Sequence, residues 1–420
     1  MRLALNGRFY AAPITGVQRF AREIASRLCR EEEVTLFLPA GAGVPPELTD
    51  VPVVRGRLRG HAWEQLELPG QLARAACDVE LHLAGTAPRC TARSVVVVHD
   101  VLPLTDARWF GLRFRTWRRA VLRRALPSAA RVLTVSRWSR EEIARALPVQ
   151  RARIEIVSQG LDPFTAPASP ERVAAVRARR GLTGPYLLAL GAGDPRKNVA
   201  FLECVLERWR EALGPPPRLV VVGQPAPRLF AGAQTSVPAR AGVGTGAQAA
   251  RARPSLPWRR PGASATRPSG WAASAVDRQD VLHLGRVDDV ELNALYTGAA
   301  AFCFPALAEG FGRPPLEAMA CGTPAVVAEY GPAREVLGRG ARILPLEPDA
   351  WVRALAELIH EGPAREALAA RGRAWARRFS WDLAAQQVRA VCEVVAALAA
   401  AGAHVARPAD AVFTPGTVRH

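Results

Sequence analysis

The chain has 420 residues, which is enough for two domains of ordinary size with separate cores. Its net charge of +18 comes from 56 basic residues, and because Lys197 is the only lysine, the other 55 are arginines. These arginines are scattered, and no nucleic-acid-binding motif or aromatic–basic platform accompanies them, so we expect no nucleic acid partner.

The seven cysteines are an odd number without a C-x-x-C pair, which argues against a disulfide framework and a zinc ribbon. Residues 1–7 lack the apolar core of a secretory signal, and no uninterrupted apolar run reaches the length of a membrane span. The Ala-rich stretch 391–406 is interpreted as a packed amphipathic helix. These features predict a cytoplasmic protein with reduced thiols.

The first part of the chain alternates apolar runs of strand length with helical patterns. Strands are expected at 2–6, 34–38, 94–98, 131–135 and 153–157, and helices at 17–30, 110–126 and 139–147. The run at 94–98 is typical of a strand buried on both faces, because it consists almost wholly of valine. Strands that alternate with helices predict an α/β fold with a parallel, doubly wound sheet.

A second α/β series follows the Pro- and Ala-rich segment 160–170. Strands are expected at 186–190, 218–222, 281–284 and 301–304, and helices at 198–213, 291–297 and beyond 345. We therefore predict one domain at 1–170 and another at 181–380. Residues 231–276 lack apolar periodicity and predict a disordered insertion, and 408–420 predict a frayed tail.

The motif with the most chemical content is EGFGRPPLEAMACGTP at 309–324. Its glycines allow a tight turn after a buried strand, Pro315 suits the first turn of a helix, and Gly322 is expected to end that helix. Such a helix N-terminus favours a phosphate or another anion. Glu309 on the loop and Glu317 in the first helical turn are placed to accept hydrogen bonds from vicinal hydroxyls of a sugar or ribose. A glycine turn before a helix, considered without the rest of the 309–324 motif, also fits an ordinary strand-to-helix connection.

A second loop, GAGDPRKN at 191–198, follows the first strand of the second series. In a parallel sheet this loop lies at the ligand-binding edge, together with the 309–324 motif. Arg196 and Lys197 are therefore predicted to stabilise a departing diphosphate, with each charge-assisted hydrogen bond contributing about 1.5–3 kcal/mol. A lysine kept among so many arginines indicates a site that a guanidinium does not fit, although chance survival of one lysine is the alternative.

Two further candidates lie in the first domain. His99 ends the valine strand and precedes Asp100 at the ligand-binding edge, so a catalytic and a structural role are equally compatible with its position. Gly16 lies where the first strand turns into its helix, and its N–H is placed to approach a phosphate. The other histidines show no metal-ligand spacing and no D-x-D triplet occurs, so we expect no cofactor and catalysis without a bound metal.

Together these motifs resemble those of retaining glycosyltransferases of the GT-B fold, family 4. The resemblance covers most of the chain apart from 231–276 and the tail, and it includes TGVQR at 15–19, WEQ at 63–65, VHD at 98–100, TVSR at 134–137 and PRKN at 195–198. It implies two Rossmann-like domains facing a cleft, with 381–403 as a last helix that crosses back to the first domain. It also implies a nucleotide-sugar donor mainly on the second domain and the acceptor on the first.

The resemblance assigns roles within the 309–324 motif. Glu309 would hold the donor sugar's hydroxyls, assisted by the N–H groups of Gly310, Phe311 and Gly312. Glu317 would hold the ribose hydroxyls.

The resemblance also places Lys197 at the diphosphate and His99 near the donor sugar. Many relatives carry an arginine where this chain has Ala192, and Arg196 is the residue that would supply that charge instead. The insertion at 231–276 is a second departure, because it replaces a connection that is usually short.

The activity that the resemblance implies is a retaining, metal-independent transfer of a sugar to a glycan or lipid-linked acceptor, as in surface-polysaccharide or glycoconjugate assembly. The PRKN variant resembles mannosyltransferases and favours GDP-mannose as the donor, while UDP-glucose, UDP-GlcNAc and dTDP-rhamnose stay open. A nucleotide-sugar epimerase or hydrolase on the same fold is one alternative. A non-catalytic binder of sugar nucleotides is another.

Residues 110–126 form a basic amphipathic pattern. Six arginines alternate there with Phe114, Trp117, Val121 and Leu122. Peripheral contact with the inner face of a membrane is one interpretation of this pattern, and an ordinary helix with a solvated charged face is the other.

Overall fold

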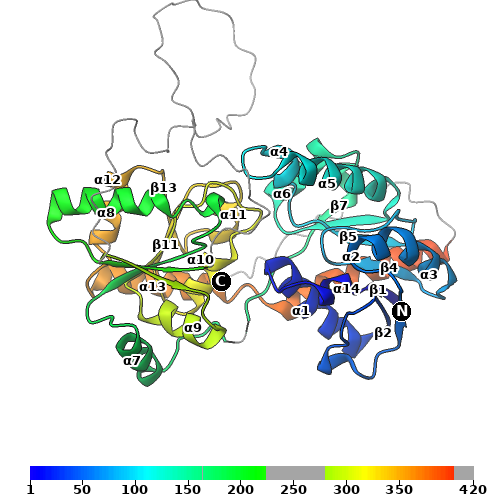
Figure 1. The fold of residues 1–420 in the computed structure, drawn as a ribbon, viewed down its shortest axis with the longest axis horizontal. Coiled ribbons are helices and arrows are strands. Elements are labelled where there is room, and N and C mark those ends of the chain that lie inside the picture. The colour runs from blue at the N-terminus through cyan, green and yellow to red at the C-terminus, as the bar shows by residue number, and fades with distance from the viewer. Residues whose placement is uncertain (163, 224–279, 402–420) are drawn as a thin grey trace, which may run out of the picture. The chain divides into compact units, whose positions relative to one another are not determined.

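The computed structural model describes residues 1–162, 164–223 and 280–401 and divides into two compact units (Figure 1). Unit 1 comprises Met1–Thr105, Thr116–Asp162 and Phe379–His420, and unit 2 comprises Asp106–Arg115 and Pro163–Arg378. The division falls at residue 162, several residues before the predicted boundary at 170. The predicted insertion at 231–276 and the predicted tail at 408–420 lie outside the described residues.

Unit 1 is built on a seven-stranded parallel sheet in the order β3-β2-β1-β4-β5-β6-β7. The strands are β1 (Arg2–Asn6), β2 (Glu33–Leu38), β3 (Val53–Arg55), β4 (Val79–His82), β5 (Ser94–Val97), β6 (Arg131–Thr134) and β7 (Ile154–Ile156). The strand order reverses direction between β1 and β4. Ligands in open parallel sheets bind beyond the carboxyl ends of strands at such a switch point.

Helices cover both faces of the unit 1 sheet. They are α1 (Gly16–Glu31), α2 (Gly60–Ala62), α3 (Leu68–Arg74), α4 (Leu102–Thr105), α5 (Leu112–Ala125), α6 (Arg137–Ala146) and α14 (Trp381–Ala400). Val95 and Val97 pack in the core that α1 and α14 cover, whereas Val96 and Val98 pack with α5 and α6. Consecutive strand residues point to opposite faces, which is why an all-valine strand is needed where both faces are buried.

Helix α14 has the length and apolar composition of a helix that crosses a membrane, a feature that the sequence analysis did not anticipate. In the structure one side of α14 belongs to the unit 1 core, through Trp381, Ala384, Val388, Cys392 and Val395. The core helix of a globular domain passes the same length and composition test when it is mostly buried, and in α14 33% of the apolar window is buried.

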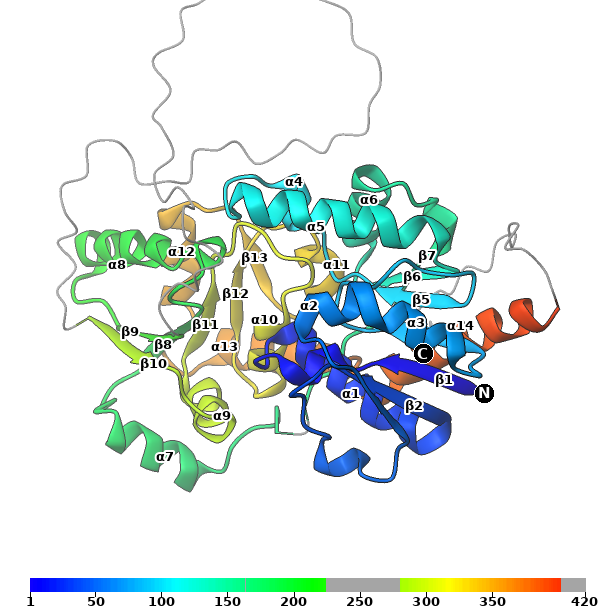
Figure 2. The same cartoon turned by 45° about the vertical axis from the view of Figure 1, so that its right-hand side comes forward.

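Unit 2 repeats the strand order of unit 1 with six parallel strands in the order β10-β9-β8-β11-β12-β13, which Figure 2 shows side by side. The strands are β8 (Tyr186–Leu190), β9 (Arg218–Val222), β10 (Val281–Gly285), β11 (Ala301–Phe304), β12 (Ala325–Ala328) and β13 (Arg342–Leu344). The switch point lies between β8 and β11, which are the strands that precede the two predicted ligand loops.

The helices of unit 2 also lie on both faces of its sheet. They are α7 (Pro170–Arg179), α8 (Ala200–Leu213), α9 (Asp289–Gly298), α10 (Arg313–Ala320), α11 (Ala333–Leu337), α12 (Pro348–Ala356) and α13 (Pro363–Ala376). Leu187 and Ala189 pack with α8 and α12, whereas the Phe302 ring lies 5.4 Å from the ring of Tyr296 on α9. The predicted α/β class with two doubly wound sheets is therefore confirmed.

Helix α5 occupies the predicted basic segment at 110–126. Its residues Val121 and Leu122 are buried, and Leu122 belongs to the unit 1 core. Part of the apolar side of the predicted amphipathic pattern is therefore already covered by protein. Any membrane contact of this helix would depend on the charge of its exposed arginines.

Candidate functional site

The two predicted ligand loops of unit 2 meet at its switch point. The loop at 191–198 follows β8 and the loop at 305–312 follows β11, and these strands are paired in register. The Leu307 N–H donates to the Arg196 carbonyl at 2.7 Å, so the loops are joined through the backbone as well. The carboxyl edge of the sheet thus brings Lys197 and Glu309 together, as the fold class predicts.

Lys197 and Glu309 form a close ion pair. The Lys197 Nζ lies 2.7 Å from the Glu309 Oε1 and 4.6 Å from the centre of the Phe304 ring. A side chain on Gly191, whose φ is +99°, would overlap the Lys197 stem, so the lysine lies directly on the loop backbone. An ammonium has three N–H donors, and one carboxylate partner leaves capacity for a second anion.

Arg196 is held differently from its neighbour. Its Nε and Nη2 donate to the two carboxylate oxygens of Asp194 at 3.0 and 2.6 Å, and its guanidinium lies 5.6 Å from the centre of the Phe110 ring. The carboxylate of Asp194 therefore compensates the positive charge of Arg196, which was predicted to stabilise a diphosphate. Both predicted cations are therefore paired with a carboxylate, and they differ in that Arg196 uses two N–H donors on Asp194 while Lys197 contacts one oxygen of Glu309.

The glycine turn after Glu309 rests on a tyrosine. Gly312 has a φ of +93° and precedes α10, and a Cβ there would overlap the hydroxyl of Tyr330. That hydroxyl donates to the Phe311 carbonyl at 3.3 Å. Burial, followed by the charge of Glu309, raises the pKa of Tyr330 well above its ordinary value, so the phenol stays a neutral donor. Tyr330 lies beyond the 309–324 motif and is not among the predicted site residues.

Replacing Gly312 with alanine tests this packing. The left-handed backbone costs an alanine about 1–2 kcal/mol, and the overlap with Tyr330 adds to that cost. We expect a clearly lower melting temperature for Gly312→Ala in thermal unfolding. The control is Gly184→Ala, also in unit 2, where no atom lies within 4 Å of the added Cβ and the backbone is not left-handed. Equal melting temperatures for the two variants would contradict the account.

Glu317 differs from its prediction in position and in partners. It is the fifth residue of α10 and lies in the second turn, because the helix begins at Arg313, two residues before Pro315. Arg313 Nε donates to one of its carboxylate oxygens at 2.6 Å and the Tyr296 hydroxyl donates to the other at 3.0 Å. A ligand hydroxyl would bind a carboxylate that Arg313 and Tyr296 already orient.

The N-terminus of α10 offers fewer donors than predicted. Positions 314 and 315 of its first turn are prolines, which carry no N–H. The C-terminal end matches the prediction: Gly322 has a φ of +85°, and its N–H donates to the Met319 carbonyl at 3.0 Å. Anion binding by backbone at this loop would therefore depend on Gly310, Phe311 and Gly312.

His99 of unit 1 is 7% exposed and its ring lies edge-on to Phe20 at 4.9 Å. Burial lowers the pKa of His99 to about 4, and the charge of Arg118 contributes to this lowering. A backbone hydrogen bond with Leu83 acts in the opposite direction and raises the pKa. Its Nε2 has no hydrogen-bond partner among the described residues. His99 is therefore a neutral imidazole with one unused ring nitrogen.

Gly16 is the first residue of α1, and a Cβ added there would meet no atom within 4 Å. The space over this helix N-terminus is thus open within the described structure. Thr15 precedes it without a side-chain cap on the helix. The predicted approach of the Gly16 N–H to a ligand is sterically possible, and it stays a prediction.

A polar network at the switch point of unit 1 was missed as a site. Glu64 is fully buried and accepts hydrogen bonds from Asn6 Nδ2 at 2.9 Å, Arg8 Nε at 3.0 Å, His61 Nδ1 at 3.1 Å and Thr86 Oγ1 at 2.8 Å. Burial alone would raise the pKa of Glu64, but the hydrogen bond of His61, the charge of Arg8 and the hydrogen bond of Asn6 outweigh it and leave the pKa below its ordinary value. The carboxylate is thus ionised and fixed.

Two features mark this network as more than ordinary packing. Glu64 lies in a π-helical turn, Trp63–Glu67, and such turns are rare and frequent at functional sites. His82 is fully buried, its Nδ1 lies 3.2 Å from Asn6 Nδ2, and its Nε2 has no partner among the described residues. The WEQ motif at 63–65 was the only signal of this site in the sequence.

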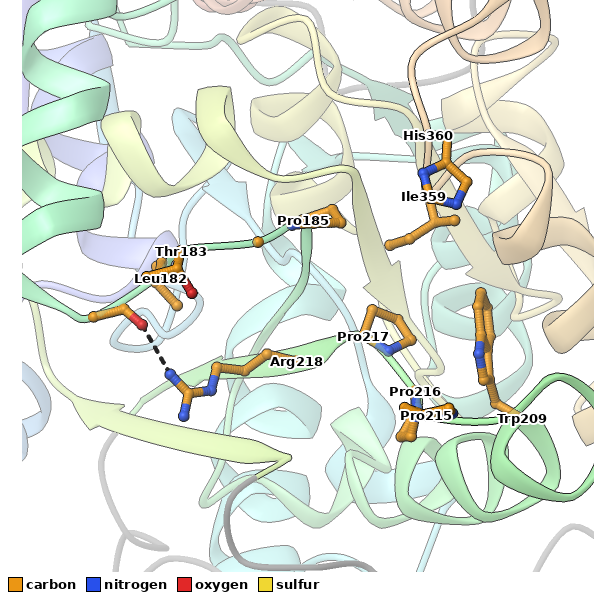
Figure 3. A pocket seen from close by; sticks show the side chains of 12 residues that line it. Leu182, Thr183, Pro185, Trp209, Pro215, Pro216, Pro217, Arg218, Ile359 and His360 are labelled. Carbon is orange, nitrogen blue, oxygen red and sulfur yellow. Dashed lines mark hydrogen bonds between the residues drawn. The ribbon is translucent and has the colours of Figure 1, made fainter.

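Unit 2 also has a hollow of about 500 Å³ at the opposite end of its strands (Figure 3). It lies where β8 and β9 begin and is lined largely by apolar residues, including Leu182, Trp209 and Pro217. Arg218 donates from Nη1 to the Gly181 carbonyl at 3.0 Å and is held at its wall. None of the predicted site residues lines this hollow, and it lies away from the ligand-binding edge.

Models of two families match the chain. The model described as "Glycosyl transferases group 1" matches residues 176–375, and the model described as "Glycosyltransferase Family 4" matches residues 14–163.

Similar proteins match along most of the chain. The chain is 27% identical over 397 residues to "O-antigen chain mannosyltransferase B" of Escherichia coli, covering 88% of this chain and 93% of the relative. It is 27% identical over 412 residues to "D-inositol 3-phosphate glycosyltransferase" of Xylanimonas cellulosilytica, covering 88% and 89%. The solved structure of HepE of Anabaena in complex with UDP and glucose matches with a TM-score of 0.64 at 17% identity, covering 94% and 100%. At that identity the structural likeness shows a shared fold.

Proposed function

We propose that the chain, which matches models of two glycosyltransferase families and has the GT-B type of α/β domains, transfers a sugar from a nucleotide-sugar donor with retention of configuration. The observation that carries the proposal is the pairing of Lys197 with Glu309 at the switch point of unit 2. A cation and a carboxylate side by side match a ligand with a diphosphate next to a sugar. The proposed acceptor is a glycan or a lipid-linked acceptor.

The proposed reaction breaks the bond between the sugar's anomeric carbon and the diphosphate oxygen. Lys197 stabilises the charge that develops on the departing diphosphate, while Glu309 orients the sugar through its hydroxyls. The acceptor oxygen bonds to the anomeric carbon on the same face, and its proton passes to the departing phosphate oxygen. His99 is proposed to contact the donor sugar as a neutral imidazole, since protonation is disfavoured in its buried position.

Mannose is the favoured sugar and GDP-mannose the favoured donor. The support is the PRKN loop at 195–198 and the similarity to a protein named as an O-antigen chain mannosyltransferase. UDP-glucose is the main competitor, since HepE was solved with UDP and glucose. We also propose a cytoplasmic location, for which the seven free cysteines are the support, and electrostatic contact of α5 with an anionic membrane surface.

Donor identity is tested by thermal unfolding and by product analysis. A ligand at 100 times its dissociation constant adds about 2.7 kcal/mol to the stability of the folded state, so the true donor should raise the melting temperature more than other nucleotide sugars. NMR of the product then reports the anomeric configuration. Free sugar or an isomeric nucleotide sugar formed at the same rate without any acceptor would favour the hydrolase or epimerase alternative instead.

Transfer activity is expected to survive EDTA. The proposed chemistry stabilises the diphosphate with Lys197 and loop N–H groups, and within the described ranges no group of three His, Cys, Asp or Glu side chains is placed to hold a metal. The measurement compares initial rates before and after EDTA and after Mg²⁺ or Mn²⁺ is restored. A strict requirement for a divalent ion would overturn this part of the mechanism.

A further inference from the structure

Two guanidinium groups lie against the loop that follows β4 in unit 1. Arg8, which follows β1, donates from Nη2 to Thr86 Oγ1 at 2.7 Å. Arg118 of α5 lies against Gly85, where the position of a Cβ is 3.0 Å from Arg118 Nη2. Gly85 has a φ of +75°, so the space between the loop and Arg118 is kept free of a side chain. The two arginines therefore lie against neighbouring residues, 85 and 86, at the switch point of the sheet.

The two arginines differ in how their charges are balanced. Arg8 pairs with the buried carboxylate of Glu64 at 3.0 Å. Arg118 is half-buried and has neither an ion pair nor a hydrogen bond within the described parts of the chain. Burial lowers the pKa of Arg118, the charge of Asp100 opposes this, and the charge of Arg8 adds to it. Burying a guanidinium partly without an anionic partner costs free energy, so a bound anion would stabilise this site.

The surrounding groups hold Arg8 in place and connect the pair to the predicted site. Arg8 donates a hydrogen bond from Nε to the Glu64 carboxylate and another from Nη2 to Thr86 Oγ1. The Thr86 hydroxyl in turn donates to Glu64. Arg8 therefore has little freedom to turn away from the loop. The charge of Arg118 also acts on His99, which follows β5, the strand next to β4. The arginine pair thus lies beside the histidine predicted to contact the donor sugar.

We propose that Arg8 and Arg118 form an anion site that binds a phosphate group of the acceptor. Guanidinium groups present fixed forks of N–H donors that match phosphate oxygens, and two of them suit a dianion better than a single carboxylate. The name acceptor rests on the proposed glycosyl transfer. The anion site itself does not, because phosphate binding is measured without turnover.

The first experiment follows the melting temperature of the full chain with added inorganic phosphate at constant ionic strength. We expect phosphate to raise the melting temperature of the wild type and of Lys197→Ala, because Lys197 belongs to unit 2. We expect no rise for Arg118→Met. The matched control is Arg123→Met, an exposed arginine on the same helix, which should respond like the wild type. An equal rise in Arg118→Met, or its loss in Lys197→Ala alone, would overturn the proposal.

Arg118→Met has a second expected signature. Without phosphate its melting temperature should equal or exceed that of the wild type, since the change removes an uncompensated, half-buried charge. If the variant fails to fold, Gly85→Ala supplies the same test, because its Cβ narrows the space at Arg118 Nη2. A folded Gly85→Ala that still gains the full phosphate-dependent rise would contradict the site.

The phosphate of the acceptor has two sources, a lipid headgroup or a soluble sugar phosphate. Flotation with vesicles containing phosphatidic acid tests the first, and titration with glucose 6-phosphate tests the second. The control is Arg57→Met, an exposed arginine outside α5, for the vesicles and Arg123→Met for the sugar phosphate. Binding that depends on Arg118 but not on the control residue supports the site in either arm and identifies the source. Arg118-independent behaviour in both arms would refute it. Absence of sugar transfer with intact phosphate binding would instead count only against the proposed function.

Discussion

Lys197→Ala is expected to lower kcat by about 10²–10³-fold, because loss of one preorganised donor to a developing oxyanion typically has that effect. The ammonium lies at the switch point of unit 2 and contacts Glu309 at 2.7 Å, so it is placed to meet a diphosphate without displacing its partner. Its main effect should fall on the transition state, where charge on the leaving group is greatest. Steady-state kinetics should therefore show a larger change in kcat than in KM.

Lys197→Arg separates charge from shape. Arginine keeps the positive charge, but its planar head is wider than an ammonium, and the lysine stem already lies on the backbone of Gly191. We expect a substantial loss of kcat in this variant too. Arg208→Lys, which exchanges an exposed arginine of unit 2 for lysine, is the control and should retain full activity. Near-normal turnover in Lys197→Arg would mean that the single lysine has no special role.

Glu64→Gln is expected to destabilise unit 1 by about 3–5 kcal/mol, the cost of removing one partner from a buried charge pair. The glutamine amide places an NH₂ donor where a carboxylate oxygen accepted hydrogen bonds. At least one of the four donors therefore loses its acceptor, and these are Asn6, Arg8, His61 and Thr86. Denaturant or thermal unfolding near pH 7 measures the loss. Glu142→Gln is the control, because its pair with Arg145 lies at the surface and contributes about 0–1 kcal/mol.

The same change should alter the pH dependence of stability. The pKa of Glu64 in the folded protein lies below its ordinary value of 4.5. A lowered pKa stabilises the fold above pH 4.5, and that contribution falls as the pH drops toward the folded-state value. The difference in stability between wild type and Glu64→Gln should therefore be largest near neutral pH and shrink below pH 4.5. A difference that stays constant down to pH 3 would exclude an ionised, tightly held Glu64.

If Arg8 binds phosphate, the stability of the Glu64 network and phosphate binding at unit 1 should depend on each other. Arg8 is held by Glu64, so Glu64→Gln should weaken phosphate binding at unit 1 as well as stability. Lys197→Ala leaves that network unchanged, because the residue lies in the other unit. Effects that stay separate in this way would show that the two switch points bind different parts of the reacting system.

Local sequence patterns were sufficient to predict the α/β class and the proximity of the two loops that carry Lys197 and Glu309. Runs such as 94–97 and 301–304 are apolar on both faces, and only a covered parallel strand suits them. Positive backbone φ at Gly191, Gly312 and Gly322 follows from turn chemistry that neighbouring residues determine. Because parallel strands end at a common edge, Lys197 and Glu309 could be brought together from their strand positions alone.

Three strands were not predicted from the sequence, either because they are short or because they carry polar residues. β4 carries the buried Glu80 and His82, which interrupt its apolar pattern, and β3 and β13 have three residues each. These strands form because their neighbours supply backbone hydrogen bonds, and because Ser94 and Thr91 donate to the Glu80 carboxylate. That support comes from residues distant in the sequence, so no local window contains it.

The unit 1 site was determined by tertiary structure alone. Asn6, Arg8, Glu64, Thr86 and Arg118 come from four separate segments, and their spacing in the sequence carries no motif of metal, phosphate or acid–base chemistry. The order of β1 and β4 in the sheet places Asn6, Arg8 and Thr86 around the Glu64 carboxylate, and α5 adds Arg118. Buried ionic groups are favourable only when several partners converge, and that convergence is a property of the folded chain.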